Sequence, residues 1–172
     1  MGEIKSTLDL VMERTRHLSL SAEEKEEQQR QDFEKKLQGF LQQYADEAMS
    51  MDGLRERITA LEKETGVAGH ELSVEAVLRR IDPDRDNHRW MVVLEHLAPD
   101  VCRPLKKILE AYGKEQAALL QTGRRLLGDR LAREDGITGS AVVPNPRKDP
   151  ANQKKLTDLL HLTRTKIEAL AE

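Results

Sequence analysis

The sequence has very little cysteine and few aromatic residues. Its 172 residues include one cysteine, one tryptophan, two tyrosines and two phenylalanines. A single cysteine, Cys102, excludes a structural disulfide within the chain and suits a reducing compartment. Cys102 lies at apolar spacing with no His–Asp pair beside it, which predicts a buried, inert thiol. With so few rings, leucine, isoleucine, valine and methionine must form the core.

Long apolar runs are missing as well. No stretch approaches the length that spans a bilayer, and the N-terminus lacks the apolar centre of a signal peptide. We therefore expect a cytoplasmic protein without a membrane span. Residues 1–6 match the short pattern for N-myristoylation, which is loose enough to occur by chance.

The sequence also lacks the familiar motifs of enzymes and nucleotide sites. It has no P-loop, Rossmann glycine pattern, nucleophile elbow or HExxH motif. The three aspartates of 82–86 alternate like the start of a calcium loop, but Asn87 replaces the glycine and Val93 the final glutamate that such a loop needs. A capped turn between two helices explains these aspartates better. We expect no enzymatic activity and no cofactor.

Two residue pairs have spacings that occur in helical metal sites. They are Glu13 with His17 and Asp158 with His161. A chain rich in acidic residues produces such pairs by chance, so we expect no bound metal. A metal- or ligand-binding helical bundle stays as an alternative.

What the sequence does contain is helical periodicity. Apolar residues make up 38% and charged residues 34% of the chain, which is typical of long helices with narrow buried stripes. The spacing predicts a first helix over residues 3–18. Ser21 and Glu24 then form a capping box that starts a second helix. Residues 23–32 hold no apolar side chain, so the start of that helix cannot pack against a core.

The apolar stripe of the second helix begins at Phe33 and continues to Tyr44, and a further stripe covers 54–61. Two interpretations are open for residues 22–65: one continuous rod of roughly 65 Å, or two helices broken near 49–53. A rod of that length would favour a partner chain, because so small a protein could not cover it.

The second half of the chain alternates helices with turn signals. Ser73 can cap a short helix that ends at Ile81, and Asp82-Pro83 can restart another. A long helix is expected over 100–135 and a last helix over 150–171. Trp90, Leu105 and Ile108 are predicted core residues. We predict one all-α domain over 1–172, with six or seven helices in a long antiparallel, coiled-coil-like bundle.

The charges are unevenly distributed. Residues 1–100 have a balance of -8 and residues 101–172 a balance of +5, within a net charge of -3. The candidate basic surface consists of Arg124, Arg125, Arg130 and Arg133. No aromatic residues interleave with these arginines, so single-stranded nucleic acid would find no stacking platform. Nucleic-acid binding through this half is therefore an alternative, and a solvated face is the simpler interpretation.

A helix-turn-helix outline near residues 82–100 is a second route to nucleic-acid binding. His88 and Arg89 would be its base-reading residues. The segment has five acidic and two basic residues, so repulsion from phosphate would outweigh what two side chains gain. This interpretation is not favoured.

Residues 136–149 are the one clearly non-helical stretch and give the candidate interaction segment. Two glycines, two prolines and a β-branched pair disfavour helix there. The candidate contact residues are Ile137, Gly139, Val142, Val143, Pro144 and Asn145. They could tuck into a groove between helices or pair as an edge strand with a partner chain.

The stretches GEIKSTLDLVMERTRHLSLSAEEKEE (2–27) and GITGSAVVPN (136–145) resemble a family of bacterial helical proteins with no assigned activity. The resemblance implies a bacterial cytoplasm and argues against myristoylation. From the residues themselves we predict a non-enzymatic helical interaction or regulatory protein, acting through protein–protein contacts as a homodimer.

Overall fold

The computed structural model describes residues 21–139 and 141–171. Contacts divide the chain into two compact units, Met1–Gly69 and His70–Glu172, and each is described by itself. Within the described residues there are six α-helices and no strand, so the predicted all-α fold is confirmed. The predicted helix over residues 3–18 lies outside the described part. The expectation of one domain stays a prediction.

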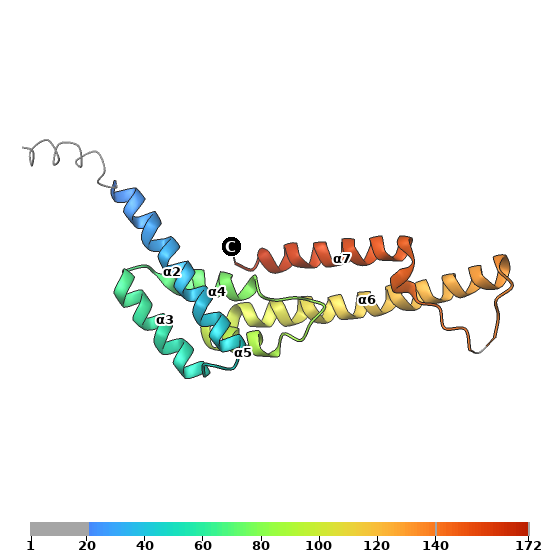
Figure 1. The fold of residues 1–172 in the computed structure, drawn as a ribbon, viewed down its shortest axis with the longest axis horizontal. Helices are drawn as coiled ribbons and strands as arrows, with labels where there is room; N and C mark the ends of the chain where they lie inside the picture. The colour runs from blue at the N-terminus through green and yellow to red at the C-terminus, as the bar shows by residue number, and fades with distance from the viewer. Residues whose placement is uncertain (1–20, 140, 172) are drawn as a thin grey trace, which may run out of the picture. The chain divides into compact units, whose positions relative to one another are not determined.

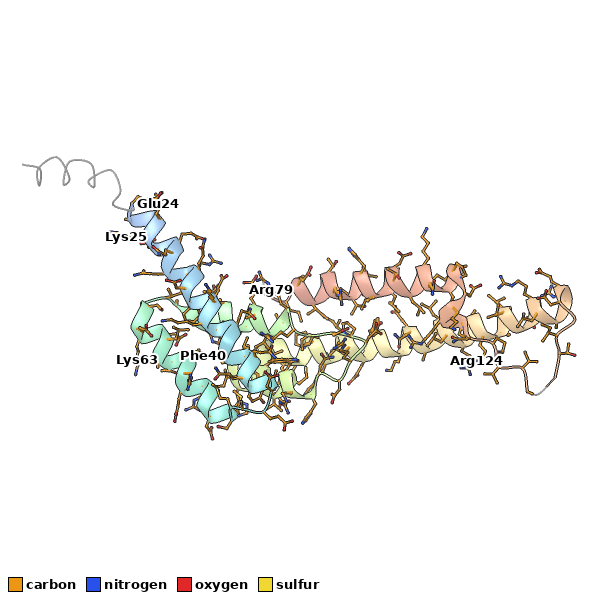
Figure 2. All side chains as sticks on the ribbon, viewed as in Figure 1. Glu24, Lys25, Phe40, Lys63, Arg79 and Arg124 are labelled. Atoms are coloured by element: carbon orange, nitrogen blue, oxygen red, sulfur yellow. The ribbon has the colours of Figure 1, made fainter. Side chains whose placement is uncertain are left out.

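The first unit contains α2 (Ala22–Ala45) and α3 (Met51–Thr65), which pack against each other (Figure 1). The capping box at Ser21 and Glu24 is present, with both hydrogen bonds formed. Residues 21–32 are all exposed, as their composition predicts, and Figure 2 shows Glu24 and Lys25 projecting there. Packing begins at Phe33, which is fully buried.

Residues 22–65 form two helices and not one continuous rod, which decides between the two interpretations that the sequence left open. Residues 46–50 are not helical, and Glu47 has a positive φ of 61°. Ser50 starts α3 by accepting a hydrogen bond from the amide of Gly53. Gly66 ends α3 in the left-handed conformation, with φ of 71°, which suits a residue without a Cβ.

The second unit contains α4 (Gly69–Leu78), which begins at the unit boundary, α5 (His88–Leu97), α6 (Pro99–Glu134) and α7 (Pro150–Glu168). A short 3₁₀ turn, η1 (Pro146–Lys148), precedes α7. In Figure 1, α5 lies against the first half of α6, and α7 runs back along α6 in the opposite direction. Asp149 caps α7 by accepting from the amide of Asn152.

Two predicted helix starts in this unit are wrong. The first was Ser73, which lies inside α4 with its side chain fully buried. The helix instead begins at Gly69, where a Cβ would lie 2.0 Å from Cζ of Phe33, so only glycine fits. The second was Asp82-Pro83. Residues 82–87 form a hydrogen-bonded turn, and α5 begins at His88.

The predicted core residues of the second unit are confirmed in part. Leu105 is fully buried, whereas Ile108 and Trp90 are only half-buried. Both lie beside surface hollows that leave one side of each ring or chain accessible.

Candidate functional site

The two halves of α6 lie in different surroundings. Cys102, Leu105 and Tyr112 are buried in the first half, but no residue of 113–134 is fully buried. We call residues 113–162 the arm: the second half of α6, the connection, and the first part of α7 that pairs with it. All nine leucines of the arm are half-buried or exposed. The arm therefore lacks the closed core that packs the rest of the unit.

Exposed apolar side chains gather in the arm. Across the described residues, four large apolar side chains are classed as exposed: Leu126 (53%), Ile137 (47%), Val143 (74%) and Leu162 (52%). Every one of them belongs to the arm. Scattered exposed apolar residues are normal on a protein surface, but such a concentration on one element marks a contact surface.

One tight contact fixes the arm. A Cβ on Gly123 would lie 2.8 Å from Oδ1 of Asn152 and 3.0 Å from Cβ of Pro146. Asn152 donates to the carbonyl of Pro146 over 3.1 Å. Of the arm residues that the structure describes, Asn152 and Pro146 are the two that are buried. The connection and α7 are thus held to α6 at a glycine, because only glycine allows so close an approach.

The two parts of the candidate interaction segment lie in different surroundings, because only its end near Pro146 takes part in the contact at Gly123. Pro144 lies near Gly128, and Asn145 caps η1 by accepting from the amide of Arg147. Val142 donates from its amide to the carbonyl of Gly139, whose φ of 124° requires glycine. The stretch around Pro144 and Pro146 therefore lies against α6. Ile137 and Val143 are exposed, and no strand forms in the described part of the segment.

The four arginines of the candidate basic surface do not share one face of α6. At about 100° per residue, Arg124 and Arg133 point about half a turn apart. Arg130 is paired with Asp149, with 3.1 Å between Nη2 and Oδ1. Arg133 donates to the carbonyl of Asp129. Arg124, which lies where α7 accompanies α6 (Figure 2), and Arg125 make no hydrogen bond or ion pair with other described residues.

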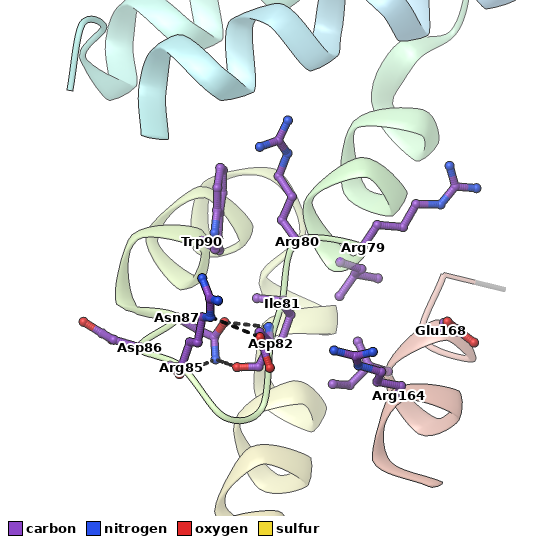
Figure 3. A pocket seen from close by; sticks show the side chains of 12 residues that line it. Arg79, Arg80, Ile81, Asp82, Arg85, Asp86, Asn87, Trp90, Arg164 and Glu168 are labelled. Carbon is purple, nitrogen blue, oxygen red and sulfur yellow. Dashed lines mark hydrogen bonds and ion pairs between the residues drawn. The ribbon is translucent and has the colours of Figure 1, made fainter. Parts of the chain in front are cut away.

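One hollow of the second unit measures about 570 Å³ (Figure 3). It is lined by four arginines, three from the segment between α4 and α5 and one from α7: Arg79, Arg80, Arg85 and Arg164. Figure 3 shows that Arg79 and Arg80 diverge rather than converge.

These arginines are largely engaged by neighbours within the unit. Arg79 pairs with Glu75 at 2.5 Å, and Arg85 pairs with Asp82 at 3.4 Å. Arg80 stacks over Trp90, 5.2 Å from the ring centroid. The hollow thus offers no convergent set of cations for an anionic ligand.

The turn beside this hollow is held by side-chain hydrogen bonds. Asn87 is buried and donates to the carbonyls of Asp82 and Arg85 over 2.8 and 3.0 Å, and it accepts from the amide of Asp82. Asp84 accepts from the hydroxyl of Tyr112 over 2.6 Å and from Gln116 over 2.7 Å. The expected capped turn is thereby tied to α6.

Burial and the bond to Asp84 raise the pKa of Tyr112 to about 12. Burial also raises the pKa of the Cys102 thiol, which lies 4.0 Å from the Glu95 carboxylate. Glu95 in turn accepts from Lys106 over 2.6 Å, which lowers the pKa of Glu95 and raises that of Lys106. A protonated, buried thiol is a poor nucleophile, so nothing here forms a catalytic pair.

The metal alternative finds no support among the residues described. No group of three or more His, Cys, Asp or Glu side chains there could hold a metal ion. His161 is exposed on α7, while Glu13 and His17 lie outside the described residues. The absence of a bound metal stays a prediction. Within the same described ranges, no helix has the length and apolarity needed to cross a bilayer.

Sequence reasoning missed the arm as a unit. The signal available was the glycine at position 123 inside a strong helical stripe, which marks a close helix contact. The half-burial of the leucines around it follows from having one neighbouring helix, and periodicity does not show how many neighbours a helix has. In comparisons with known proteins, no protein-family model, curated protein or solved structure matches this chain.

Proposed function

We propose that this protein is a non-enzymatic helical interaction protein of the bacterial cytoplasm, which acts as a homodimer and contacts its partner through the arm. One observation supports it above the others. The four large apolar side chains classed as exposed within the described residues all lie in the arm. Covering them on a partner would release the free energy that their exposure costs, about 25 cal/mol per Å² of apolar surface.

Light scattering after size exclusion tests the homodimer. At micromolar concentration the mass should be twice the 19.6 kDa of one chain. Hydrogen exchange in the arm should also slow on going from dilute to concentrated protein, because a partner covers amides that the chain alone exposes. A monomer mass with unchanged exchange in the arm would contradict the proposal.

Binding of nucleic acid by the basic C-terminal half is the competing function. The arrangement of the arginines does not favour it, since Arg124 and Arg133 face in different directions and Arg130 is paired. Titration of a labelled DNA duplex at several salt concentrations distinguishes the two functions. We expect no measurable affinity at physiological salt. Affinity that falls steeply as salt rises would favour the nucleic-acid function instead.

A further inference from the structure

One side of α6 in the arm has a regular stripe. Its members alternate at steps of four and three residues: Glu115, Leu119, Thr122, Leu126, Asp129 and Arg133. Such spacing keeps side chains on one face of a helix. All of them are exposed except Leu119, which is half-buried. The stripe is therefore a surface with leucines at its centre and charges along it.

A matching stripe lies on α7. It consists of Ala151, Lys155, Asp158, Leu162 and Lys166, all exposed. Leu159, half-buried, is turned only about -20° from Asn152 at about 100° per residue, so it lies on the side of α7 that faces α6. Leu162 is the most exposed leucine of α7, at 52%.

The two stripes lie on the same face of the helix pair. Gly123 and Asn152 face each other across the pair. At about 100° per residue, Leu126 is turned about -60° from Gly123, and Leu162 about -80° from Asn152. The two helices of an antiparallel pair are related by an approximate twofold axis perpendicular to the plane that contains both helices. Residues that are turned by similar angles from the contact between the helices therefore lie on the same face of the pair.

Two hollows between α6 and α7, one in the arm and one where the arm begins, agree with this placement. One, of about 260 Å³, is lined by Leu126 from α6 together with Ala151 and Lys155 from α7. The other, of about 170 Å³, is lined by Glu115 from α6 and Lys166 from α7. Each hollow thus has members of both stripes. We call the two stripes together the leucine face.

The charges of the leucine face suit a second copy of itself. It has three acidic residues and three basic residues: Glu115, Asp129, Asp158, Arg133, Lys155 and Lys166. A surface with no net charge meets its own copy without net repulsion, as an isologous contact requires. The same balance gives a polyanion no gain.

The size of the face is also sufficient. Each stripe is about 25 Å long and the two helices together are about 20 Å wide. A self-contact would therefore bury about 500 Å² on each copy, or about 1,000 Å² in total, which reaches the threshold for a biological interface and suits a dimer of moderate affinity.

We infer that two copies of the chain pair through the leucine face, so that the two arms form a four-helix contact. The leucines at the centre of the face, with Leu126 and Leu162 foremost, become buried between the copies. This inference depends on the proposed homodimer and specifies its surface and its partner. Four-helix bundles pack their helices around a shared core of such apolar positions.

The test compares masses of the full-length wild type and the double variant Leu126→Glu/Leu162→Glu at micromolar concentration. Both positions are about half exposed, so the variant should keep the helical circular dichroism of the wild type. Like charges placed in the apolar contact should raise the dimer dissociation constant by about 100-fold, since each costs at least about tenfold. The variant should elute as a monomer.

The matched control is Ile137→Glu/Val143→Glu, which places the same charges on the other exposed apolar residues of the arm. We expect this control to stay dimeric. A wild-type dimer that survives the Leu126/Leu162 change would overturn the inference while leaving the homodimer intact, and so would a dimer lost only in the control. A monomeric wild type would overturn the homodimer itself.

A second experiment with lysine in place of glutamate distinguishes a variant that has lost only the dimer contact from one whose arm is misfolded. The variant Leu126→Lys/Leu162→Lys should also be monomeric alone. Mixing the Glu and Lys variants should restore a mass of two chains, because opposite charges then face each other across the contact. Failure to restore it, with both variants helical, would mean that these faces do not meet.

Discussion

The two halves of α6 form one continuous helix, yet they are stabilised differently. The half that contains Leu105 and Tyr112 is covered by α5 and by the turn that Asp84 anchors. The half beyond Tyr112 has α7 and the connection as neighbours and buries none of its own side chains completely. Helix formation is thus separable from core formation in this protein. We call the first half of α6 the anchored half. Its side chains contribute to a closed core, whereas those of the second half stay largely at the surface of the arm.

The largest expected difference between the halves comes from a buried charge. Leu105→Asp should destabilise the chain by several kcal/mol and abolish cooperative urea unfolding, because Leu105 is fully buried. Leu126→Asp should change the free energy of unfolding by only about 0.5 kcal/mol. Both are measured at high dilution, where self-association does not contribute. Equal costs would mean that the arm has a closed core.

Two glycine substitutions in α6 should give smaller changes in the free energy of unfolding, with opposite signs. Gly123→Ala should destabilise by about 1–2 kcal/mol, since the new Cβ meets buried Asn152 and Pro146 and overpacking outweighs the gain in helix propensity. Gly113→Ala has nothing within 4 Å of the new Cβ and should stabilise by about 0.5–1 kcal/mol. Thermal and urea unfolding both report these changes. The same sign for both would show that α7 does not approach α6 closely at Gly123.

The tyrosine that ends the anchored half gives a pH-dependent difference. Tyr112→Phe should cost about 1–2 kcal/mol at neutral pH, because its bond to Asp84 is lost. The folded pKa of about 12 lies above the ordinary value of 10, so the unfolded chain loses its proton first. Stability that Tyr112 supports is therefore complete below pH 10 and falls as the pH rises toward 12.

Urea unfolding of the wild type and Tyr112→Phe at pH 8, 10 and 11 measures this effect, with the two curves converging at high pH as the wild type loses roughly 1–2 kcal/mol. Asp84→Asn keeps an acceptor for the hydroxyl and should retain most of the neutral-pH stability. Parallel pH dependence in the wild type and the Phe variant would show that the Tyr112 hydroxyl is not buried against Asp84.

Local signals mark the ends of several helices, and the predicted capping box at Ser21 and Glu24 is confirmed. Ser21 with Glu24, Gly66 and Asp149 all act within three or four residues of their own position, so the sequence alone reveals them. Ser50 gave a signal of the same kind that was not recognised as a cap.

Features that depend on contacts with residues far away in the sequence could not be predicted from such local signals. Asp82 resembles a helix cap, but Asn87 holds it in a turn that Tyr112, 28 residues beyond Asp84, anchors to α6. The first residue of α4, Gly69, has no side chain because the ring of Phe33 occupies that space. In the candidate site, the apolar residues of 136–143 were noticed, but the face formed by Leu126 and Leu162 depends on how α6 and α7 are rotated against each other.

The burial of the single thiol makes the anchored half accessible to kinetic measurement. Cys102 is 2% exposed and its raised pKa keeps it protonated, so a thiol reagent can modify the native protein only when that end of α6 opens. The rate of labelling therefore reports the frequency of opening. A second cysteine placed at Val143, which is 74% exposed and lies outside the leucine face, would react at once, which allows a spectroscopic probe to be attached to the arm while the natural thiol stays unmodified.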